Sequence, residues 1–230
     1  MSINNFSNFL NSISSASLRV LDASISNSKY IALDLSKDNK ALKSIDVSSS
    51  EALENYISNH IKLNTAKVAF GGYLEQRSIY KRSNYFNDDN PKTERNIHLG
   101  VDLWIAARTP IYTPLHAMVH SFKNNTNFGD YGPTLILKHS IEGVEFYTLY
   151  GHLSIASIEN LKVGQEFKQG EQIATLGDAT VNGDYPPHLH FQIIKDLQNY
   201  KGDYPGVSNK IDLEFYKVNC PNPNLLLKLI

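Results

Sequence analysis

The sequence predicts a mainly β fold, with an antiparallel β-sheet core of sandwich or barrel-hybrid type and a small α-containing segment at the N-terminus. Beyond residue 66, short apolar runs alternate with turn signals rich in Gly, Pro, Asn and Asp, which is typical of antiparallel strands. The 13 Tyr and 10 Phe residues favour the same packing. The clearest strand candidates are 134–138, 144–150, 172–176 and 188–194.

The order of these patterns divides the chain into two parts. Residues 1–66 form an N-terminal accessory segment, in which we expect helices and a short strand at 30–35. A capping-box pattern at 48–51 predicts the start of a helix with Leu53, Ile57 and Ile61 on one face. Residues 67–230 form the larger domain, with a motif-bearing core at 98–194 and an irregular C-terminal wrap at 200–230.

The charge balance and the cysteine count restrict the classes of function. The chain has 22 basic and 23 acidic side chains, a formal net charge of −1, so we expect no nucleic-acid partner bound through a broad basic face. Cys220 is the single cysteine, which excludes an intrachain disulfide and a multi-cysteine zinc site.

The termini and the apolar runs bear on localisation. The N-terminal residues lack a cationic region, and Asn and Ser interrupt their apolar stretches, which is unlike a secretory signal. No apolar run approaches the roughly 18–20 residues that a membrane span needs. We therefore expect a cytoplasmic protein by default, or a periplasmic or secreted one if the sequence is a processed form.

Two short motifs have the spacing of a metal site. In a strand at 188–194, His188, His190 and Gln192 lie on one face, so that one imidazole can bind a metal while its neighbour reaches an activated water. His98 and Asp102, four residues apart, share a face of either a helix or a strand, and the intervening Gly and Val favour the strand. Each motif alone also fits a pair of polar surface residues.

The other histidines are less specific. His152 lies at the end of a strand entering a turn, on the same face as Tyr150, and it can join a metal site only if the two motifs converge. His116 and His120 form a rival four-spaced pair on a strand that we expect to lead away from the site. His139 is interpreted as a structural or supporting residue, and His60 as an ordinary helix residue.

Together, the motifs H-x-x-x-D, G-H-L and H-L-H-F, in this order and at these distances, resemble the lysostaphin/LytM family of zinc metallopeptidases. Three further stretches also resemble that family: the turn and strand from Thr109, the strand that ends in His139, and the Gly-rich stretch at 161–177. The resemblance covers about residues 98–194.

The resemblance implies a role for each motif residue. His98, Asp102 and His190 would bind one Zn²⁺ per chain, and His152 and His188 would be catalytic without binding it. Three protein ligands leave a fourth position open, as in catalytic zinc sites, where the pKa of bound water falls to about 7. We expect His188 to be the general base, although exchanging its role with His152 agrees equally well with the sequence.

The resemblance also implies a metalloendopeptidase that cuts peptidoglycan stems or cross-links. The bulky loop at 182–187 and Trp104 depart from the family pattern and predict a reshaped cleft. We expect Tyr150 and Tyr185 to contact the substrate, and Arg77 to receive a substrate carboxylate. Two alternatives stay open: an intracellular zinc hydrolase acting on a non-wall peptide or amide, and a non-catalytic binding or regulatory module.

Overall fold

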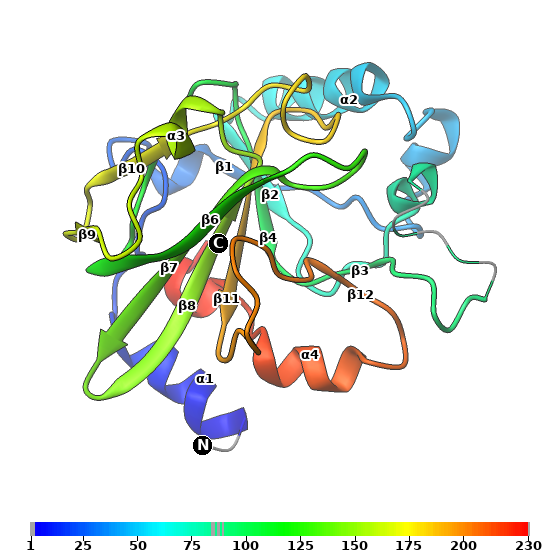
Figure 1. The fold of residues 1–230 in the computed structure, drawn as a ribbon. Coiled ribbons are helices and arrows are strands. Elements are labelled where there is room, and N and C mark those ends of the chain that lie inside the picture. Colours follow the sequence, from blue (N-terminus) through cyan, green and yellow to red (C-terminus); the bar gives the residue numbers. More distant parts are fainter. Residues whose placement is uncertain (1–2, 84–85, 87, 89, 230) are drawn as a thin grey trace.

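An eight-stranded sheet forms the centre of the fold, as the strand patterns predict (Figure 1). The structure, a computed structural model, describes residues 3–83, 86, 88 and 90–229. In spatial order, the strands are β1 (Tyr30–Ala32), β2 (Val68–Gly71), β4 (Val101–Trp104), β11 (His188–Ile194), β8 (Val144–Gly151), β7 (Gly132–Ile141), β6 (Ala117–Asn125) and β9 (Glu166–Phe167). β1 and β2 are parallel, and the other paired neighbours in this sheet are antiparallel. The mainly β prediction is confirmed.

Two small antiparallel sheets and several helices complete the fold. β5 (Pro110–Tyr112) pairs with β10 (Gln172–Thr175), and β3 (Ile97–His98) pairs with β12 (Val207–Ser208). The α-helices are α1 (Ile3–Ser12), α2 (Ser50–Leu63), α3 (Ala156–Glu159), α4 (Leu213–Asn219) and α5 (Asn224–Leu227). The predicted irregular wrap at 200–230 therefore holds two short helices and one strand. Within the described part of the chain, no helix has both the length and the apolar character that crossing a bilayer requires.

The predicted strands match the observed ones because apolar alternation directly reflects burial in a sheet. β11 occupies 188–194 as predicted, and β7 and β8 contain the candidates at 134–138 and 144–150. The helix predicted after the capping box is α2, in which Leu53 and Ile57 are buried. Its N-cap is Ser49, whose hydroxyl accepts from the backbone N–H of Ala52, so the cap lies one residue later than predicted.

The accessory segment shares both the sheet and the core with the larger domain. β1 extends the sheet through its parallel pairing with β2, and Phe6 and Leu10 of α1 belong to the same buried cluster as Phe146 and Phe191. In Figure 1, α1 and α2 lie at opposite ends of the molecule. The division at residue 66 stays a prediction, and these contacts show that the two parts pack closely.

The core also encloses His139, whose Nδ1–H donates to the carbonyl of His116, while its Nε2 accepts from the hydroxyl of Thr148. Its ring stacks on Phe146. Burial lowers the pKa of His139 from 6.5 to about 4. The imidazole is therefore neutral in the folded protein at neutral pH, which agrees with a structural role.

We expect this histidine to make the fold sensitive to acid. Between pH 6.5 and 4, His139 binds a proton in the unfolded chain but not in the folded one, so the free energy of unfolding falls as the pH falls. The loss reaches up to about 3 kcal/mol near pH 4. Urea unfolding at pH 7 and pH 4.5 measures it, with His139→Gln as the non-titrating reference. A wild-type pH dependence no steeper than that of His139→Gln would contradict the prediction.

Candidate metal centre

Three strands bring the predicted ligands together. His190 in β11 lies directly opposite Asp102 in β4, in the antiparallel register of these two strands. His98 ends β3, so it does not share a strand with Asp102 as predicted, because the chain leaves the strand conformation at residues 99–100. The break lies beside His190, and a Cβ atom on Gly100 would stand 2.6 Å from its Cε1. Glycine is therefore needed where β3 passes into β4.

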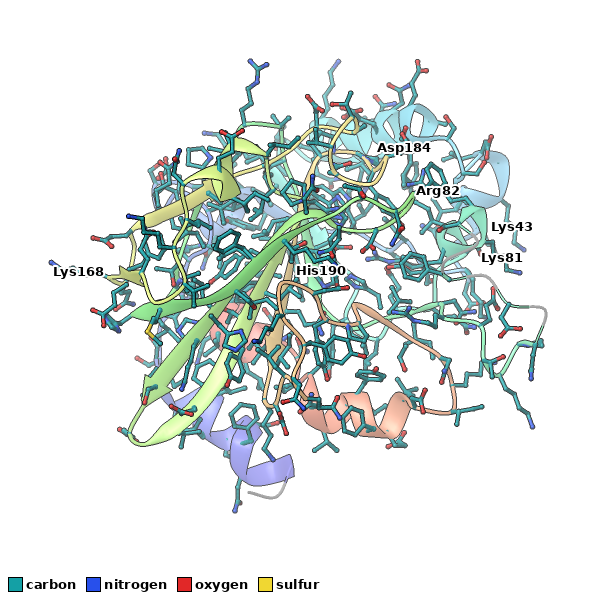
Figure 2. All side chains as sticks on the ribbon, in the orientation of Figure 1. Lys43, Lys81, Arg82, Lys168, Asp184 and His190 are labelled. Atoms are coloured by element: carbon teal, nitrogen blue, oxygen red, sulfur yellow. The ribbon has the colours of Figure 1, made fainter. Side chains whose placement is uncertain are left out.

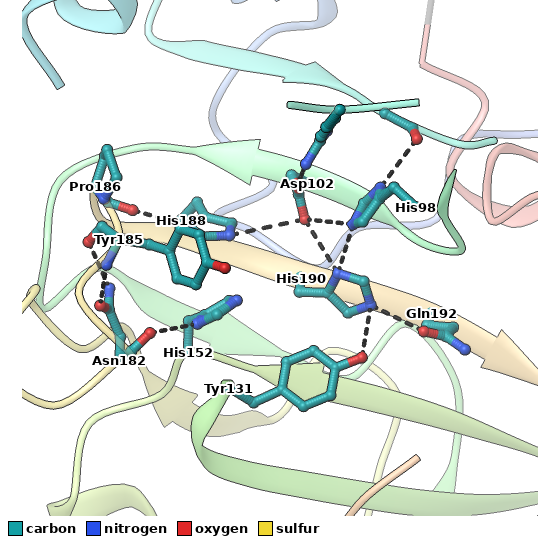
Figure 3. A network of polar contacts seen from close by, with 12 residues as sticks. His98, Asp102, Tyr131, His152, Asn182, Tyr185, Pro186, His188, His190 and Gln192 are labelled. Carbon is teal, nitrogen blue, oxygen red and sulfur yellow. Dashed lines mark hydrogen bonds and ion pairs between the residues drawn. The ribbon is translucent and has the colours of Figure 1, made fainter. Parts of the chain in front are cut away.

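The three side chains converge on one point (Figure 3). Nε2 of His98 lies 2.8 Å from Nδ1 of His190, and both nitrogens lie 3.2 Å from Oδ1 of Asp102. Zinc ligands at about 2.0–2.1 Å in a tetrahedron stand about 3.3 Å apart. In the part of the chain that the structure describes, these residues are the one group of three or more His, Cys, Asp or Glu with ligand atoms close enough to hold a metal.

The hydrogen bonds on the outer side of each imidazole fix which nitrogen faces the centre. Nδ1 of His98 donates to the carbonyl of Gly72 at 2.9 Å, which leaves Nε2 with a lone pair. The amide of Gln192 donates to the carbonyl of Pro205, so its Oε1 accepts from Nε2–H of His190 at 2.9 Å. Nδ1 of His190 therefore also has a lone pair, and three acceptor atoms face one another as they would around a cation.

The local electrostatics keep these atoms in the metal-binding form. Burial raises the pKa of Asp102, but its attraction to His98, Arg77 and His188 outweighs this effect and lowers the pKa well below its usual value. Burial lowers the pKa of His98 to about 4. At neutral pH, the centre thus presents one carboxylate and a neutral imidazole, the forms that bind a metal.

His152 and His188 form one side of this centre, with ring centroids 4.2 Å apart. Nδ1 of His152 donates to the carbonyl of Asn182, and Nδ1 of His188 donates to the carbonyl of Pro186. Each ring therefore has its lone pair on Nε2, and the Nε2 atom of His188 lies 3.8 Å from Oδ1 of Asp102. Burial is the main cause that lowers the pKa of both histidines, so both are neutral bases at neutral pH.

The three residues expected to contact the substrate lie in different environments. Tyr185 lines the same cleft as the metal ligands, close to His152. Arg77 also lines the cleft but is buried and paired with Asp102. Tyr150 is fully buried against Phe191, so the structure does not place it where a substrate could reach it. The predicted strand alternation fails here because β8 ends at residue 151 and His152 has a φ of +63°.

The rival histidines lie outside this centre. His116 is 64% exposed and pairs with Glu166, and His120 in β6 bonds to Ser121. His60 in α2 bonds to the carbonyl of Ala32. The structure agrees with the expectation that the strand from residue 117 leads away from the metal centre.

Sequence reasoning missed Tyr131, whose hydroxyl lies 3.4 Å from Nε2 of His190. Its ring also lies against His152, with a centroid separation of 5.6 Å. Cβ atoms on Gly151 and Gly206 would stand within 2.6 Å and 1.7 Å of Tyr131 atoms, so two glycines make room for the side chain. In the sequence, Tyr131 lies within a Gly-Asp-Tyr-Gly stretch, a pattern typical of a turn.

Trp104, from which a reshaped cleft was expected, lies against His188. The indole of Trp104 stacks on the ring of His188, with centroids 5.7 Å apart and an interplanar angle of 21°. The two residues are directly opposite in the β4–β11 register. Trp104 thus forms one side of the pocket around His188.

A comparison with known families agrees with these motifs. Residues 96–202 match peptidase family M23. The M23 region, as we call these residues, contains the five residues predicted to bind the metal or to act in catalysis: His98, Asp102, His152, His188 and His190. The resemblance to lysostaphin/LytM-type peptidases is confirmed.

Individual relatives are similar to part of this chain. A Haemophilus influenzae protein described as an uncharacterized metalloprotease is 33% identical over 131 residues, which are 56% of this chain and 25% of that protein. A zinc containing peptidase from Vibrio cholerae is 29% identical over 45% of this chain and 31% of its own, with a TM-score of 0.36. The catalytic domain of lysostaphin from Staphylococcus simulans is 22% identical over 68% of this chain and 96% of its own, with a TM-score of 0.40. This chain therefore spans only a quarter to a third of the first two relatives.

Proposed function

We propose that this chain is a zinc-dependent metalloendopeptidase that hydrolyses peptide bonds in the stems or cross-links of peptidoglycan. The observation that carries the proposal is the convergence of His98, Asp102 and His190, with two neutral histidines beside them. The M23 match over the same residues supports the peptidase class. The choice of peptidoglycan rests on the resemblance of the motifs.

The chemistry of the donor set fits zinc. Two imidazole nitrogens and one carboxylate oxygen are ligands that catalytic zinc sites use, with the fourth position left to water or substrate. When bound, zinc lowers the pKa of water towards 7 and polarises a carbonyl group. These are the two functions that peptide hydrolysis requires without a Ser or Cys nucleophile.

His188 and His152 would move the protons. Their Nε2 atoms carry the lone pairs, because the carbonyls of Pro186 and Asn182 hold the Nδ1 protons. We propose that His188, whose Nε2 lies 3.8 Å from Asp102, accepts the proton of the attacking water. His152 would then stabilise the developing oxyanion or protonate the leaving amine. Tyr185, beside His152, would contact the substrate.

Digestion of purified muropeptides, followed by mass spectrometry, tests this function. We expect the wild-type protein with added Zn²⁺ to cut a peptide bond, so that the masses of the two fragments add up to the mass of the intact muropeptide plus one water. The His188→Ala variant is the control, since it should keep the metal and lose the cleavage. Intact muropeptides together with cleavage of a soluble peptide library would contradict the peptidoglycan substrate and leave the peptidase class in place.

A further inference from the structure

A buried ion-pair chain runs from the outside of the metal centre to one of its ligands. Nε of Arg77 donates to Oε2 of Glu75 at 2.5 Å, and Nη1 of Arg77 donates to Oδ2 of Asp102 at 2.5 Å. The exposed fractions of Glu75, Arg77 and Asp102 are 11%, 5% and 1%. At such low exposure an ion pair is screened little by solvent, and its geometry is held firmly.

The two oxygens of Asp102 have separate partners. Oδ2 accepts from Arg77, whereas Oδ1 faces the lone pairs of His98 and His190. We propose that Arg77 is a positioning residue, which holds the Asp102 carboxylate so that Oδ1 alone is presented to the metal. This proposal rests on the metal site of the proposed function, but not on the substrate or on hydrolysis.

Glu75 holds Arg77 in turn. One of its carboxylate oxygens accepts from Nε of Arg77, and the other accepts from the backbone N–H of Leu35 at 2.9 Å. The negative charge of Glu75 also offsets that of Arg77, which would otherwise stand as an uncompensated cation close to a bound metal ion. Because Leu35 belongs to residues 1–66, the accessory segment contributes directly to this support.

The backbone at Gly72 leaves room for the side chain of Arg77. Gly72 has a φ of +107°, and a Cβ atom there would stand 2.0 Å from Nη2 of Arg77 and 2.8 Å from Nδ1 of His98. The carbonyl of the same glycine accepts from His98. One glycine therefore orients one ligand through its carbonyl and leaves room for the side chain that orients another.

These contacts revise the role expected for Arg77. The sequence suggested that its guanidinium receives a substrate carboxylate, but two of its nitrogens already bind Glu75 and Asp102. The third, Nη2, is buried and has no hydrogen-bond partner among the described residues. The face of Trp104 covers the guanidinium at 5.5 Å. The arginine is thus enclosed beside the metal centre, and the carboxylate that it binds belongs to Asp102, a proposed metal ligand, and not to a substrate.

The affinity for Zn²⁺ tests the proposal. Outer partners of metal ligands typically contribute about 10–100-fold to affinity, so we expect Arg77→Met to raise the zinc dissociation constant by about that factor. Arg77→Lys should recover part of the loss, because lysine keeps the positive charge but lacks the planar guanidinium that donates to both carboxylates. Glu75→Gln should give a smaller loss. Competition with a chromophoric chelator gives each constant, and circular dichroism of the metal-free protein verifies the fold.

Arg82→Met is a matched control. The side chain of Arg82 is also only 4% exposed, but it pairs with Asp184 (Figure 2). Its guanidinium also donates to the carbonyl of Ser48 and lies over the ring of Tyr185. Among the described residues, Arg82 contacts none of the three proposed metal ligands, so we expect its removal to change the stability and leave the zinc dissociation constant unchanged. Equal losses of affinity in Arg82→Met and Arg77→Met would indicate a general structural effect and would overturn the proposal.

Bound Co²⁺ provides a second measurement, which a purely structural role would not change. Without Arg77, Oδ2 of Asp102 becomes free to bind the metal as well, and the visible absorption of Co²⁺ weakens as the number of ligands rises above four. We expect this weakening in Arg77→Met and not in Arg82→Met. Folded Arg77→Met and Arg77→Lys proteins with wild-type zinc affinity and Co²⁺ spectra would overturn the proposal, whether or not the wild-type protein cleaves any peptide.

Discussion

The His190→Ala variant is expected to purify without metal and to have no peptidase activity above background. His190 provides one of the three converging ligand atoms, and the remaining pair, His98 and Asp102, leaves too few protein ligands for a catalytic zinc site. Loss of a direct ligand should exceed the 10–100-fold loss of affinity that outer partners typically cause, so we expect more than about 100-fold weaker binding. Elemental analysis and chelator competition measure the effect.

His116→Ala is the control for this experiment. His116 is 64% exposed and pairs with Glu166 outside the metal centre, so its removal should leave one zinc per chain. Because His190 is buried beside Tyr131, circular dichroism is needed to distinguish loss of metal from loss of fold. A folded His190→Ala protein that retains a full equivalent of zinc at wild-type affinity would refute the ligand assignment.

The His188→Ala variant is expected to keep its zinc and to lose turnover by about 10²–10⁴-fold, the usual contribution of a general acid or base. Nε2 of His188 lies 3.8 Å from Oδ1 of Asp102, next to the ligand cluster, while its Nδ1 is held by the carbonyl of Pro186. The loss should appear in kcat, because the imidazole acts during the reaction and not as a metal ligand. Steady-state kinetics with a cleaved muropeptide, together with zinc analysis, measures both quantities.

Two further variants complete this test. His120→Ala, on β6 and outside the centre, should keep wild-type kcat. His152→Ala should also lose turnover, and the variant that abolishes the acidic limb of the pH–rate profile identifies the general base. Wild-type kcat in a zinc-loaded His188→Ala protein would show that His188 has no part in the reaction.

The sequence alone predicted the sheet and the five motif residues of the candidate centre. Alternating apolar residues report burial locally, which is why β11 was predicted with its observed bounds. The pairing of His190 with Asp102 was not predictable in detail, because the register between strands depends on contacts distant in sequence. The metal and catalytic roles of these residues stay predictions, although the lone pairs converge as those roles require.

The structure differs from the expectations, or adds to them, where a local sequence pattern is compatible with more than one tertiary arrangement. Tyr150 was expected at the cleft because strict alternation was extended through His152, where the backbone is left-handed. The pairing of Arg77 with Asp102 was not foreseen, since nothing near Arg77 in the sequence reveals a carboxylate 25 positions later. The contact of Arg77 with a substrate stays a prediction. Tyr131 was missed because the glycines that make room for it, at 151 and 206, lie far along the chain.

The stacking of Trp104 on His188 has a practical consequence. Trp104 is the single tryptophan of the chain, so the intrinsic fluorescence excited at long ultraviolet wavelengths comes from one indole. That indole touches the ring proposed to exchange protons and covers the guanidinium proposed to orient a ligand. The emission of the unlabelled protein is therefore a built-in optical probe of the centre, free of signal from any other indole.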